Sequence, residues 1–497
     1  MDDTHDLGLI LDANTPIIVI ESLDERRVLK LLLSLALTRG QSLQEWSATN
    51  GLRAGGIAPD LRQDPVLSDP DELLAHLARS WQSDGNSTTG AGIYALCDIH
   101  PYINEPKIIR WLKDIALDHH RSGITLVLIS HELKLPTELN SYSATFNLRL
   151  PSEEELMAMV RETALQWASQ NTNQRVRTDR ATLDKLIANL RGLTHADAST
   201  LIRRAIFDDG AINESDIPDL NRLKFELLGA QGVLRFEYAT AQFNEVAGLT
   251  NLKQWLELRE TPIKENRKDR PKGVMLLGVQ GGGKSLAAKC VASAWGMPLL
   301  RLDFGTLYNK FFGETERNLR NCLQQAELMA PCVLWMDEIE KGIATGDSDN
   351  ATSQRVLGTL LTWMAENTKP VFIVATSNDI SKLPPELIRK GRLDEVFFID
   401  LPNHDMRVKM FDIHLRKRDA QPEDFDLEQL AESAQGFTGA EIEQAIVSAR
   451  YQCEAQARAL CTDSVDAALK RTYPMSVLRG EYVAQLRQWA ENRTVPA

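Results

Sequence analysis

Two short segments in the second half of the chain carry side chains that could handle a phosphorylated ligand. Residues 278–285 read Gly-Val-Gln-Gly-Gly-Gly-Lys-Ser, and residues 333–338 read Val-Leu-Trp-Met-Asp-Glu. Closely spaced glycines let a loop wrap around phosphates with its N–H groups pointing inward, and the lysine adds positive charge. Two acids after an apolar run can serve a metal ion and a water molecule. Together the segments predict a site for ATP and Mg²⁺.

Each side chain in these segments has a predicted role. Nucleotide contacts are assigned to the loop residues Gly278, Gly281, Gly282, Gly283, Lys284 and Ser285 and to Asp337. Lys284 would reach the β- and γ-phosphates, and Ser285 would hold the magnesium ion with support from Asp337. Glu338 would orient or deprotonate the attacking water. A glycine-rich turn and a solvated strand end are the alternatives, and the joint occurrence of both segments in this order disfavours them.

Secondary structure must bring these segments together. Residues 272–277, Lys-Gly-Val-Met-Leu-Leu, predict a buried strand that runs into the glycine loop, and a helix from about Lys284 to Trp295 would point its positive end at the phosphates. Residues 371–378 predict another buried strand. Its terminal Asn378 would lie beside the phosphates at the carboxyl edge of a parallel sheet. Asn378 is therefore the candidate for a second water-positioning group.

A turn with two arginines follows. Residues 383–394 carry Arg389 and Arg392 and precede a predicted strand at 396–400. An arginine that contacts the γ-phosphate in the transition state, called an arginine finger, can raise the rate by about 10³–10⁵. From their charge alone, the two could equally be surface arginines.

The order and the amino-acid sequences of these motifs over residues 241–451 resemble those of the AAA family of ATPases. The resemblance implies that Arg389 and Arg392 act in trans on the nucleotide of a neighbouring subunit, so activity would need a homo-oligomeric ring, usually of six. Residues 436–442 look like the family's helical lid, with Gly-Ala in the place of the nucleotide-sensing arginine of broader relatives. Nucleotide contacts are also assigned to Val246 and Gly248.

A further motif concerns the use of the ATP energy. Residues 310–316, Lys-Phe-Phe-Gly-Glu-Thr-Glu, are similar to the first pore loop of AAA unfoldases, in which an aromatic residue grips a polypeptide. This makes Phe311, with Phe312 beside it, the candidate contact to a protein substrate. Alternatively, both are core residues at the start of a helix. The neighbouring glycine and charged residues favour the loop.

The first half of the chain repeats parts of the second. Residues 183–186 and 192–197 match residues 427–430 and 436–441, both at an offset of 244 residues, which indicates a duplicated domain.

The first copy lacks the chemistry of the second. An acidic segment, 21–27, stands where the glycine loop would be. Asp98 ends a predicted strand in the place of Asp337, but Ile99 replaces the second acid, and no arginine stands at the finger position. We hypothesise that the first half, to about residue 215, is an inactive AAA-like unit used for assembly or partner binding.

This combination resembles, over nearly the whole chain, an AAA family of cyanobacteria and plastids known as a hypothetical chloroplast reading frame. The predicted fold class is α/β, with a P-loop AAA-type parallel sheet and helical lid preceded by a degenerate AAA-like copy. The predicted divisions are a degenerate α/β domain without a P-loop (1–150), a degenerate lid (151–215), a linker (216–240), the active large domain (241–401), a helical lid (402–475) and a C-terminal helix (476–497).

Composition limits other interpretations. A formal charge of −13 over 497 residues disfavours a nucleic-acid partner. The apolar run at 31–37 is too short to span a membrane, and the acidic start does not resemble a secretory signal. We expect a soluble protein, cytoplasmic or in the plastid stroma if plastid-encoded.

The cysteines and histidines suggest no further site. The six cysteines form no Cys-x-x-Cys pair, which suits reduced core thiols without a structural metal. The pairs His119-His120 and His131-Glu132 are interpreted as surface or helix-end residues. Neither forms His-Glu-x-x-His, because Leu135 stands where the second histidine would be.

Three functions remain open. The favoured one is an ATP-hydrolysing ring that remodels or threads a protein substrate or adaptor-bound protein. The second is a nucleotide-gated scaffold or regulatory ATPase, in which ATP sets the assembly state. The third is a nucleic-acid-linked ATPase, which the acidic composition disfavours.

Overall fold

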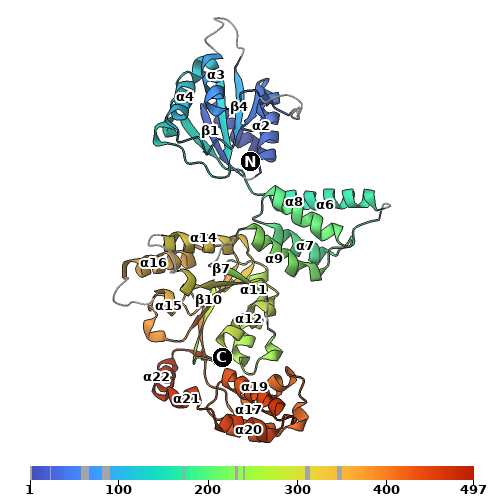
Figure 1. Ribbon diagram of the computed structural model, residues 1–497, viewed down its shortest axis with the longest axis vertical. Helices are drawn as coiled ribbons and strands as arrows, with labels where there is room; N and C mark the ends of the chain where they lie inside the picture. Colours follow the sequence, from blue (N-terminus) through green and yellow to red (C-terminus); the bar gives the residue numbers. More distant parts are fainter. Residues whose placement is uncertain are drawn as a thin grey trace. The chain divides into compact units, whose positions relative to one another are not determined.

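The structure is a computed structural model. It describes residues 3–22, 24–56, 66–80, 90–171, 174–229, 233–238, 241–307, 314–343 and 350–497. The candidate pore-loop residues Phe311 and Phe312 lie outside the described residues. The chain divides into two compact units, one of Met1–Ser152 with Thr194–Ala196, the other of Glu153–Leu193 with Asp197–Ala497. Figure 1 shows both units and labels some of their elements.

The first unit is built on a mainly parallel sheet with strand order β3-β2-β4-β5-β1-β6. Its strands are β1 (Ile17–Glu21), β2 (Ser42–Ser47), β3 (Gly51–Ala54), β4 (Gly92–Cys97), β5 (Ile124–Ser130) and β6 (Ser143–Phe146). Its helices are α1 (Asp3–Asp12), α2 (Glu25–Arg39), α3 (Pro70–Ser80), α4 (Pro106–Leu117) and α5 (His119–Ser122), with a 3₁₀ turn η1 (Thr137–Tyr142). Only β3 pairs antiparallel, with β2, among the described strands of this sheet.

Helices cover both faces of this sheet, with α3 and α4 on one side and α2 on the other (Figure 1). Leu74 and Leu112 pack in a core with Leu96 of β4, whereas Leu32 packs in a second core with Ile129 of β5. This explains why β4 is buried along its whole length, as strands of parallel sheets covered on both faces usually are.

The second unit begins with a helical bundle. Its helices are α6 (Glu153–Gln170), α7 (Arg180–Leu190), α8 (His195–Phe207) and α9 (Ile217–Leu227). Helix α9 occupies the stretch in which the sequence predicts a linker. Its Leu220 lies in the core of the bundle, and its Phe225 lies in the core of the sheet that follows. The buried Lys224 between them donates from Nζ to the carbonyl of Arg191 at 2.6 Å. Helix α9 therefore joins the bundle to the next sheet by packing.

The second sheet has strand order β13-β12-β8-β11-β10-β9-β7. Its strands are β7 (Leu234–Glu237), β8 (Gly273–Gly278), β9 (Leu299–Asp303), β10 (Cys332–Asp337), β11 (Val371–Ser377), β12 (Glu395–Ile399) and β13 (Val495–Pro496). The helices around it are α10 (Thr250–Glu257), α11 (Glu260–Lys264), α12 (Lys284–Trp295), α13 (Phe304–Leu307), α14 (Glu314–Leu328), α15 (Glu340–Ile343) and α16 (Asn350–Glu366). Helices α14 and α16 pack on one face, and α10 and α12 pack on the other.

A helical lid and a tail complete the chain. The lid helices are α17 (His404–Arg416), α18 (Leu427–Ser433), α19 (Gly439–Ala455) and α20 (Thr462–Lys470), and the tail holds α21 (Met475–Leu478) and α22 (Gly480–Ala490). Helix α22 therefore covers only part of the segment 476–497, which the sequence predicts to be a C-terminal helix. After α22 the chain forms β13, which pairs in parallel with β12, and the N–H of Ala497 donates to the carbonyl of Phe398 at 3.0 Å.

The two sheets share one topology. Strands β2-β4-β5-β1-β6 of the first correspond in order and direction to β9-β10-β11-β8-β12 of the second. The predicted fold class, an AAA-type parallel sheet with a helical lid preceded by a degenerate copy, is confirmed.

Asp98 does not take the place of Asp337, although the sequence predicts that it does. Strand β10 ends at Asp337, and the next residue, Glu338, has a φ of +48°. Strand β4 ends at Cys97, and the next residue, Asp98, has a φ of +54°. Asp98 therefore corresponds to Glu338, and the acid that the first copy has lost is the counterpart of Asp337. The sequence comparison was one residue out because it included Asp98 in the strand.

Candidate nucleotide site

The glycine loop connects β8 directly to α12, and its backbone requires glycine. Gly281 and Gly283 have φ values of +78° and +95°, which L side chains rarely adopt. A Cβ atom at Gly278 would lie 2.1 Å from the carbonyl oxygen of Ile399 on β12. Helix α12 starts at Lys284, so its first N–H groups point toward the loop. The loop therefore has the form of an anion-binding helix start.

Lys284 is buried beneath this loop. Its Nζ donates to the carbonyl oxygens of Gly278 at 2.9 Å and Val279 at 2.8 Å. Burial lowers the pKa of Lys284 to about 8, although the nearby carboxylates of Glu340 and Asp337 act in the opposite direction. The loop thus holds an amine whose charge changes at mildly alkaline pH.

Asp337 is held at the end of β10 by two donors. The hydroxyl of Thr376 donates to Oδ1 at 2.8 Å, and Nη2 of Arg301 donates to Oδ2 at 2.7 Å. These bonds fix the carboxylate at the carboxyl edge of the sheet. Ser285, the other predicted magnesium ligand, is exposed in the first turn of α12. Sequence reasoning missed Thr376 and Arg301, since neither belongs to a recognisable motif.

Glu338 forms the centre of a polar cluster. Its Oε1 accepts from Nδ2 of Asn378 at 3.0 Å, and its Oε2 pairs with Lys341. The backbone N–H of Asn378 donates to Oε1 of the buried Glu340 at 3.0 Å, and the hydroxyl of Tyr482 on α22 donates to the carbonyl of Asn378. The structure therefore brings Glu338 and Asn378 together, as their predicted roles require. Sequence reasoning missed Lys341, Glu340 and Tyr482 as neighbours of the pair.

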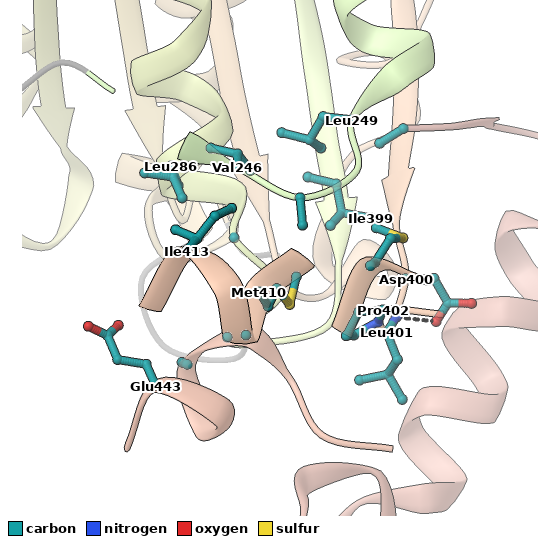
Figure 2. A pocket seen from close by; sticks show the side chains of 18 of the residues that line it. Val246, Leu249, Leu286, Ile399, Asp400, Leu401, Pro402, Met410, Ile413 and Glu443 are labelled. Atoms are coloured by element: carbon teal, nitrogen blue, oxygen red, sulfur yellow. Dashed lines mark hydrogen bonds between the residues drawn. The ribbon is translucent and has the colours of Figure 1, made fainter. Parts of the chain in front are cut away.

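A cavity of about 450 Å³ opens beside the glycine loop. Figure 2 shows that its side chains come from the start of the domain, from α12, from the end of β12 and from the lid. The residues that line it include Val246, Leu249, Gly281, Gly282, Gly283, Leu286, Ile399, Met410, Ile413, Gly439 and Ala440. Such a volume suits a small organic ligand, and its mainly apolar wall suits an aromatic base.

Two predicted contacts behave differently at this cavity. Val246 lines it, whereas Gly248 does not. Gly248 has a φ of +84°, and a Cβ atom there would lie 2.1 Å from Cε of Met406. Gly248 therefore shapes the turn that carries the lining residues Ala247 and Leu249.

The lid closes one side of the cavity. A Cβ atom at Gly281 would lie 3.0 Å from Oγ1 of Thr438, the residue that caps α19. Farther out, the Arg418 side chain bonds Glu443 at 2.7 Å and holds the pKa of that carboxyl below its usual range. Burial lowers the pKa of the neighbouring His414. The lid thus contacts the glycine loop, so its position can respond to what the loop binds.

The two candidate finger arginines differ in their surroundings. Arg392 donates from Nη1 to the carbonyl of Glu386 at 2.6 Å. Arg389 is exposed. Arg389 is therefore the better placed of the two to reach a second molecule.

The residues present fit ATP and Mg²⁺. Glycines stand at the loop positions where a Cβ atom would come too close to neighbouring atoms, among them Gly278 and Gly281. The buried amine of Lys284 lies under the loop, and an apolar cavity lies beside it. Asp337 and the hydroxyl of Ser285 are the hard oxygen ligands that Mg²⁺ prefers.

This fold and this arrangement of residues define a P-loop protein of the AAA class. Residues 274–401 match the model of the ATPase family associated with various cellular activities (AAA). Residues 3–148 and 154–231 match the N-terminal and second domains of SpoVK-like AAA ATPases. The chain belongs to the family of the ycf46 AAA domain-containing proteins.

The two ycf46 relatives that support this assignment match almost end to end. The uncharacterized AAA domain-containing protein ycf46 of Trieres chinensis is 32% identical over 98% of this chain and 96% of its own length. The ycf46 protein of Pyropia yezoensis is 32% identical over 99% of this chain and 98% of its own length. A cell division cycle protein 48 homolog of Archaeoglobus fulgidus is 34% identical over 42% of this chain and 30% of its own length.

Within the described part of the chain, no helix combines the length and the apolar character needed to cross a membrane.

Proposed function

We propose that the protein hydrolyses ATP with Mg²⁺, and that the nucleotide state controls an oligomer that remodels a protein substrate. The observation that supports hydrolysis is the hydrogen bond from Nδ2 of Asn378 to Oε1 of Glu338 at 3.0 Å. It lies next to the carboxylate of Asp337, which Thr376 holds in place. A carboxylate oriented by an amide, beside a phosphate loop, is suited to direct a water molecule at a γ-phosphate.

The roles of the chain's own residues follow from this geometry. Lys284 neutralises phosphate charge, and the loop N–H groups and the start of α12 orient the phosphates. Ser285 and Asp337 would hold Mg²⁺, which would screen the charge between the β- and γ-phosphates. Glu338 takes up or orients the proton of the attacking water, and Asn378 keeps its carboxylate aimed.

The oligomeric part of the proposal depends on Arg389. Its exposure leaves it able to reach a nucleotide on a neighbouring subunit, and Arg392 supports the same turn by its bond to Glu386. A ring, hexameric in ATP, would place such an arginine at every site. Phe311 and Phe312 are proposed as the contacts to the protein substrate, by resemblance to pore loops. We infer a cytoplasmic or plastid stromal location.

The first experiment is the native mass of Glu338→Gln with and without ATP. This change keeps the shape of the side chain but removes the carboxylate, so nucleotide should stay bound and trap any ATP-dependent ring. A hexamer that forms only with ATP, together with the loss of hydrolysis, supports the proposal. A monomer or dimer in both conditions contradicts the ring, and undiminished hydrolysis contradicts the role of Glu338.

One observation favours the second function, a nucleotide-gated scaffold. Both carboxylate oxygens of Glu338 have partners: Oε1 accepts from Asn378, and Oε2 forms an ion pair with Lys341. Such a pair would slow hydrolysis until it opens, which leaves ATP bound for longer. If Lys341→Ala raises the basal rate of ATP hydrolysis several-fold and no added protein stimulates hydrolysis by the wild type, the scaffold function is supported. The matched control is Lys264→Ala, which removes another helical lysine paired with a glutamate.

A further inference from the structure

The first copy has lost the features that would bind a nucleotide. The N-terminus of α2 is capped by its own residue Asp24, which accepts from the N–H of Arg27 at 3.2 Å, and Glu25 adds negative charge in the first turn. Glu21, at the end of β1, accepts from the N–H of Leu133 at 2.8 Å. These acids occupy the place of the glycine loop and would repel phosphates. Any ligand of this sheet edge must therefore have a different chemistry.

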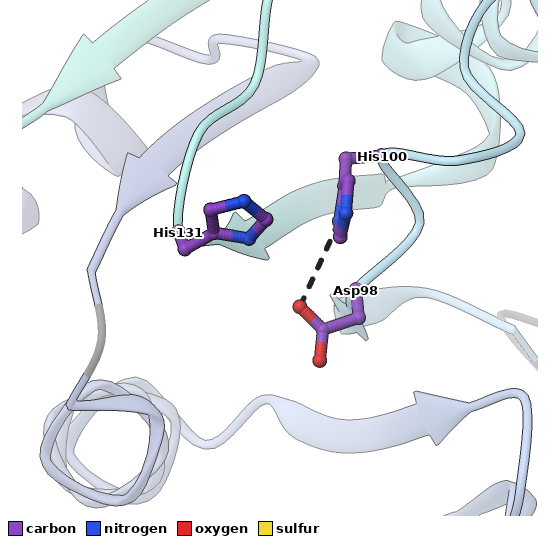
Figure 3. A group of neighbouring side chains, drawn as sticks. All are labelled: Asp98, His100 and His131. Atoms are coloured by element: carbon purple, nitrogen blue, oxygen red, sulfur yellow. Dashed lines mark ion pairs between the residues drawn. The ribbon is translucent and has the colours of Figure 1, made fainter.

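The carboxyl edge of the same sheet gathers three other side chains. Asp98 follows β4, His100 comes two residues later, and His131 follows β5 (Figure 3). One ligand atom from each, a carboxylate oxygen and two imidazole nitrogens, lies within 4.8 Å of the other two. The two imidazole rings meet edge to face with centroids 4.6 Å apart.

These three residues occupy the positions of the catalytic cluster in the second sheet. Asp98 corresponds to Glu338, and both have left-handed backbones directly after a central strand. His131 corresponds to Asn378, since each is the first residue after its strand. His100 stands where Glu340 stands. The first copy has thus kept a polar cluster at this edge while replacing two of its members by imidazoles.

Neighbouring groups orient the cluster without saturating it. The hydroxyl of Ser130, at the end of β5, lies 2.7 Å from Nδ1 of His100 and 3.4 Å from Oδ1 of Asp98. The nearest approach of Asp98 to His100 is 3.8 Å, longer than a hydrogen bond. Asp98 and His131 are exposed. An oriented imidazole beside an open carboxylate and a second imidazole is a favourable arrangement for a shared cation.

We propose that Asp98, His100 and His131 bind a divalent transition-metal ion. Two imidazoles and one carboxylate favour ions such as Zn²⁺, Co²⁺ or Ni²⁺ over Mg²⁺, which prefers oxygen ligands. Metal bonds of about 2.0–2.2 Å bring tetrahedral ligands to roughly 3.3 Å from one another, so a small rotation of the exposed side chains closes the site. Ser130 would then orient the ring through Nδ1 of His100, which it contacts at 2.7 Å, and leave Nε2 of that ring for the metal.

The position of the site suggests its consequence. Three protein ligands leave coordination positions for water or for a partner's side chain. The inactive copy would therefore carry a metal centre at the edge where the active copy carries its catalytic acid. This goes beyond the ATPase proposal and does not depend on it.

The test is a titration of the full chain, without nucleotide, with Co²⁺ followed by visible absorbance and with Zn²⁺ followed by calorimetry. We expect one ion per chain, no competition by Mg²⁺, and a loss of affinity of at least about tenfold in His131→Asn and His100→Asn. His131→Asn places in the first copy the side chain that Asn378 has in the second. The control is His76→Asn, which removes an exposed histidine of the same unit on α3.

Two results would overturn the proposal. One is a wild-type dissociation constant weaker than about 1 mM for both ions. The other is binding that persists in both histidine variants but disappears in Asp337→Asn, because the ion would then occupy the acids of the second sheet. Should a histidine variant fail to fold, Asp98→Asn serves in its place, since asparagine tolerates the left-handed backbone of Asp98. Unchanged Co²⁺ binding in that variant would also contradict the site.

Discussion

We expect the amine of Lys284 to make nucleotide binding depend on pH. Burial lowers its pKa to about 8, whereas an exposed lysine titrates near about 10.4. Because only the ionised amine attracts phosphates, we expect the affinity for ATP to fall as the pH rises above about 8, by up to about tenfold per pH unit. A fluorescent ATP analogue titrated between about pH 7 and pH 9.5 measures this.

The control for that prediction is Lys284→Met, which has no amine to titrate. It should bind ATP weakly throughout and show no decline above pH 8, so a parallel decline in both proteins would assign the effect to another group. The lowered pKa of Lys284 also makes the stability of the fold depend on pH. Between about pH 8 and 10.5 the unfolded chain binds more protons at this residue than the folded chain, so its contribution to the unfolding free energy rises with pH in that window.

Asn378 is expected to act on the rate and not on binding. Its amide holds Oε1 of Glu338 at 3.0 Å. Asn378→Ala should lower kcat by about 10²-fold, because the carboxylate loses its orientation, and should change the ATP dissociation constant by less than about threefold. Steady-state hydrolysis and equilibrium binding separate the two effects. Asn367→Ala, just before the start of β11, is the matched control, and an equal loss there would show a general effect on the strand.

Among the secondary-structure elements, α22 joins the tail to the sheet edge that carries Glu338 and Asn378. The hydroxyl of Tyr482 donates to the carbonyl of Asn378, and Arg487 bonds Asp400 at 2.9 Å. Tyr482→Phe removes one hydrogen bond and keeps the ring, so we expect a fall in hydrolysis of about two- to tenfold. Turnover at saturating ATP is the measurement. Tyr473→Phe, an exposed tyrosine before α21, should leave the rate unchanged.

Local patterns predicted some elements well and missed those that depend on distant partners. The bounds of α12, Lys284 to Trp295, were predicted because a glycine loop before it and Gly296 after it mark both ends. Strand β13 was missed because two residues carry no periodicity, and its pairing partner β12 lies about a hundred residues earlier. Helix α9 lies in a stretch that looks polar, and only Phe225 and Leu220 show what it packs against.

The same distinction holds for the sites. The glycine loop and the two acids follow one another in recognisable order, whereas Thr376, Arg301 and Lys341 join the site only through the sheet. The cluster of Asp98, His100 and His131 was invisible in sequence for this reason. Parallel strands β4 and β5 bring together residues that are about thirty positions apart, a spacing that matches no short metal-binding motif.

At the scale of the whole molecule, the two copies differ in the chemistry that their sheet edges can support. The corresponding strands of the two sheets have the same order, yet only the second sheet carries a glycine loop and an acid at the end of β10, the counterpart of β4. In the first, Cys97 takes the place of Asp337, and burial raises the pKa of its thiol, so it offers no negative charge. The second copy therefore has the groups that nucleotide chemistry needs. The first copy lacks them and presents the cluster of Asp98, His100 and His131 in their place.

The final prediction concerns communication between subunits. Arg389→Ala should keep the nucleotide loop but lose the finger, whereas Lys284→Ala should lose the loop's amine but keep the finger. If the exposed Arg389 acts in trans, a mixture of the two inactive proteins regains hydrolysis, because Lys284→Ala subunits supply arginines to Arg389→Ala sites. Random mixing at equal amounts leaves about a quarter of all sites complete.

Steady-state hydrolysis at several mixing ratios measures this recovery, and native mass shows whether mixed rings form. The control replaces the Lys284→Ala partner by the Lys284→Ala/Arg389→Ala double variant, which has no finger to offer and should restore nothing. Mixed rings without recovered activity would mean that Arg389 acts within its own subunit or not at all. In that case the ring would serve assembly alone, and the scaffold function would account better for the Glu338–Lys341 pair.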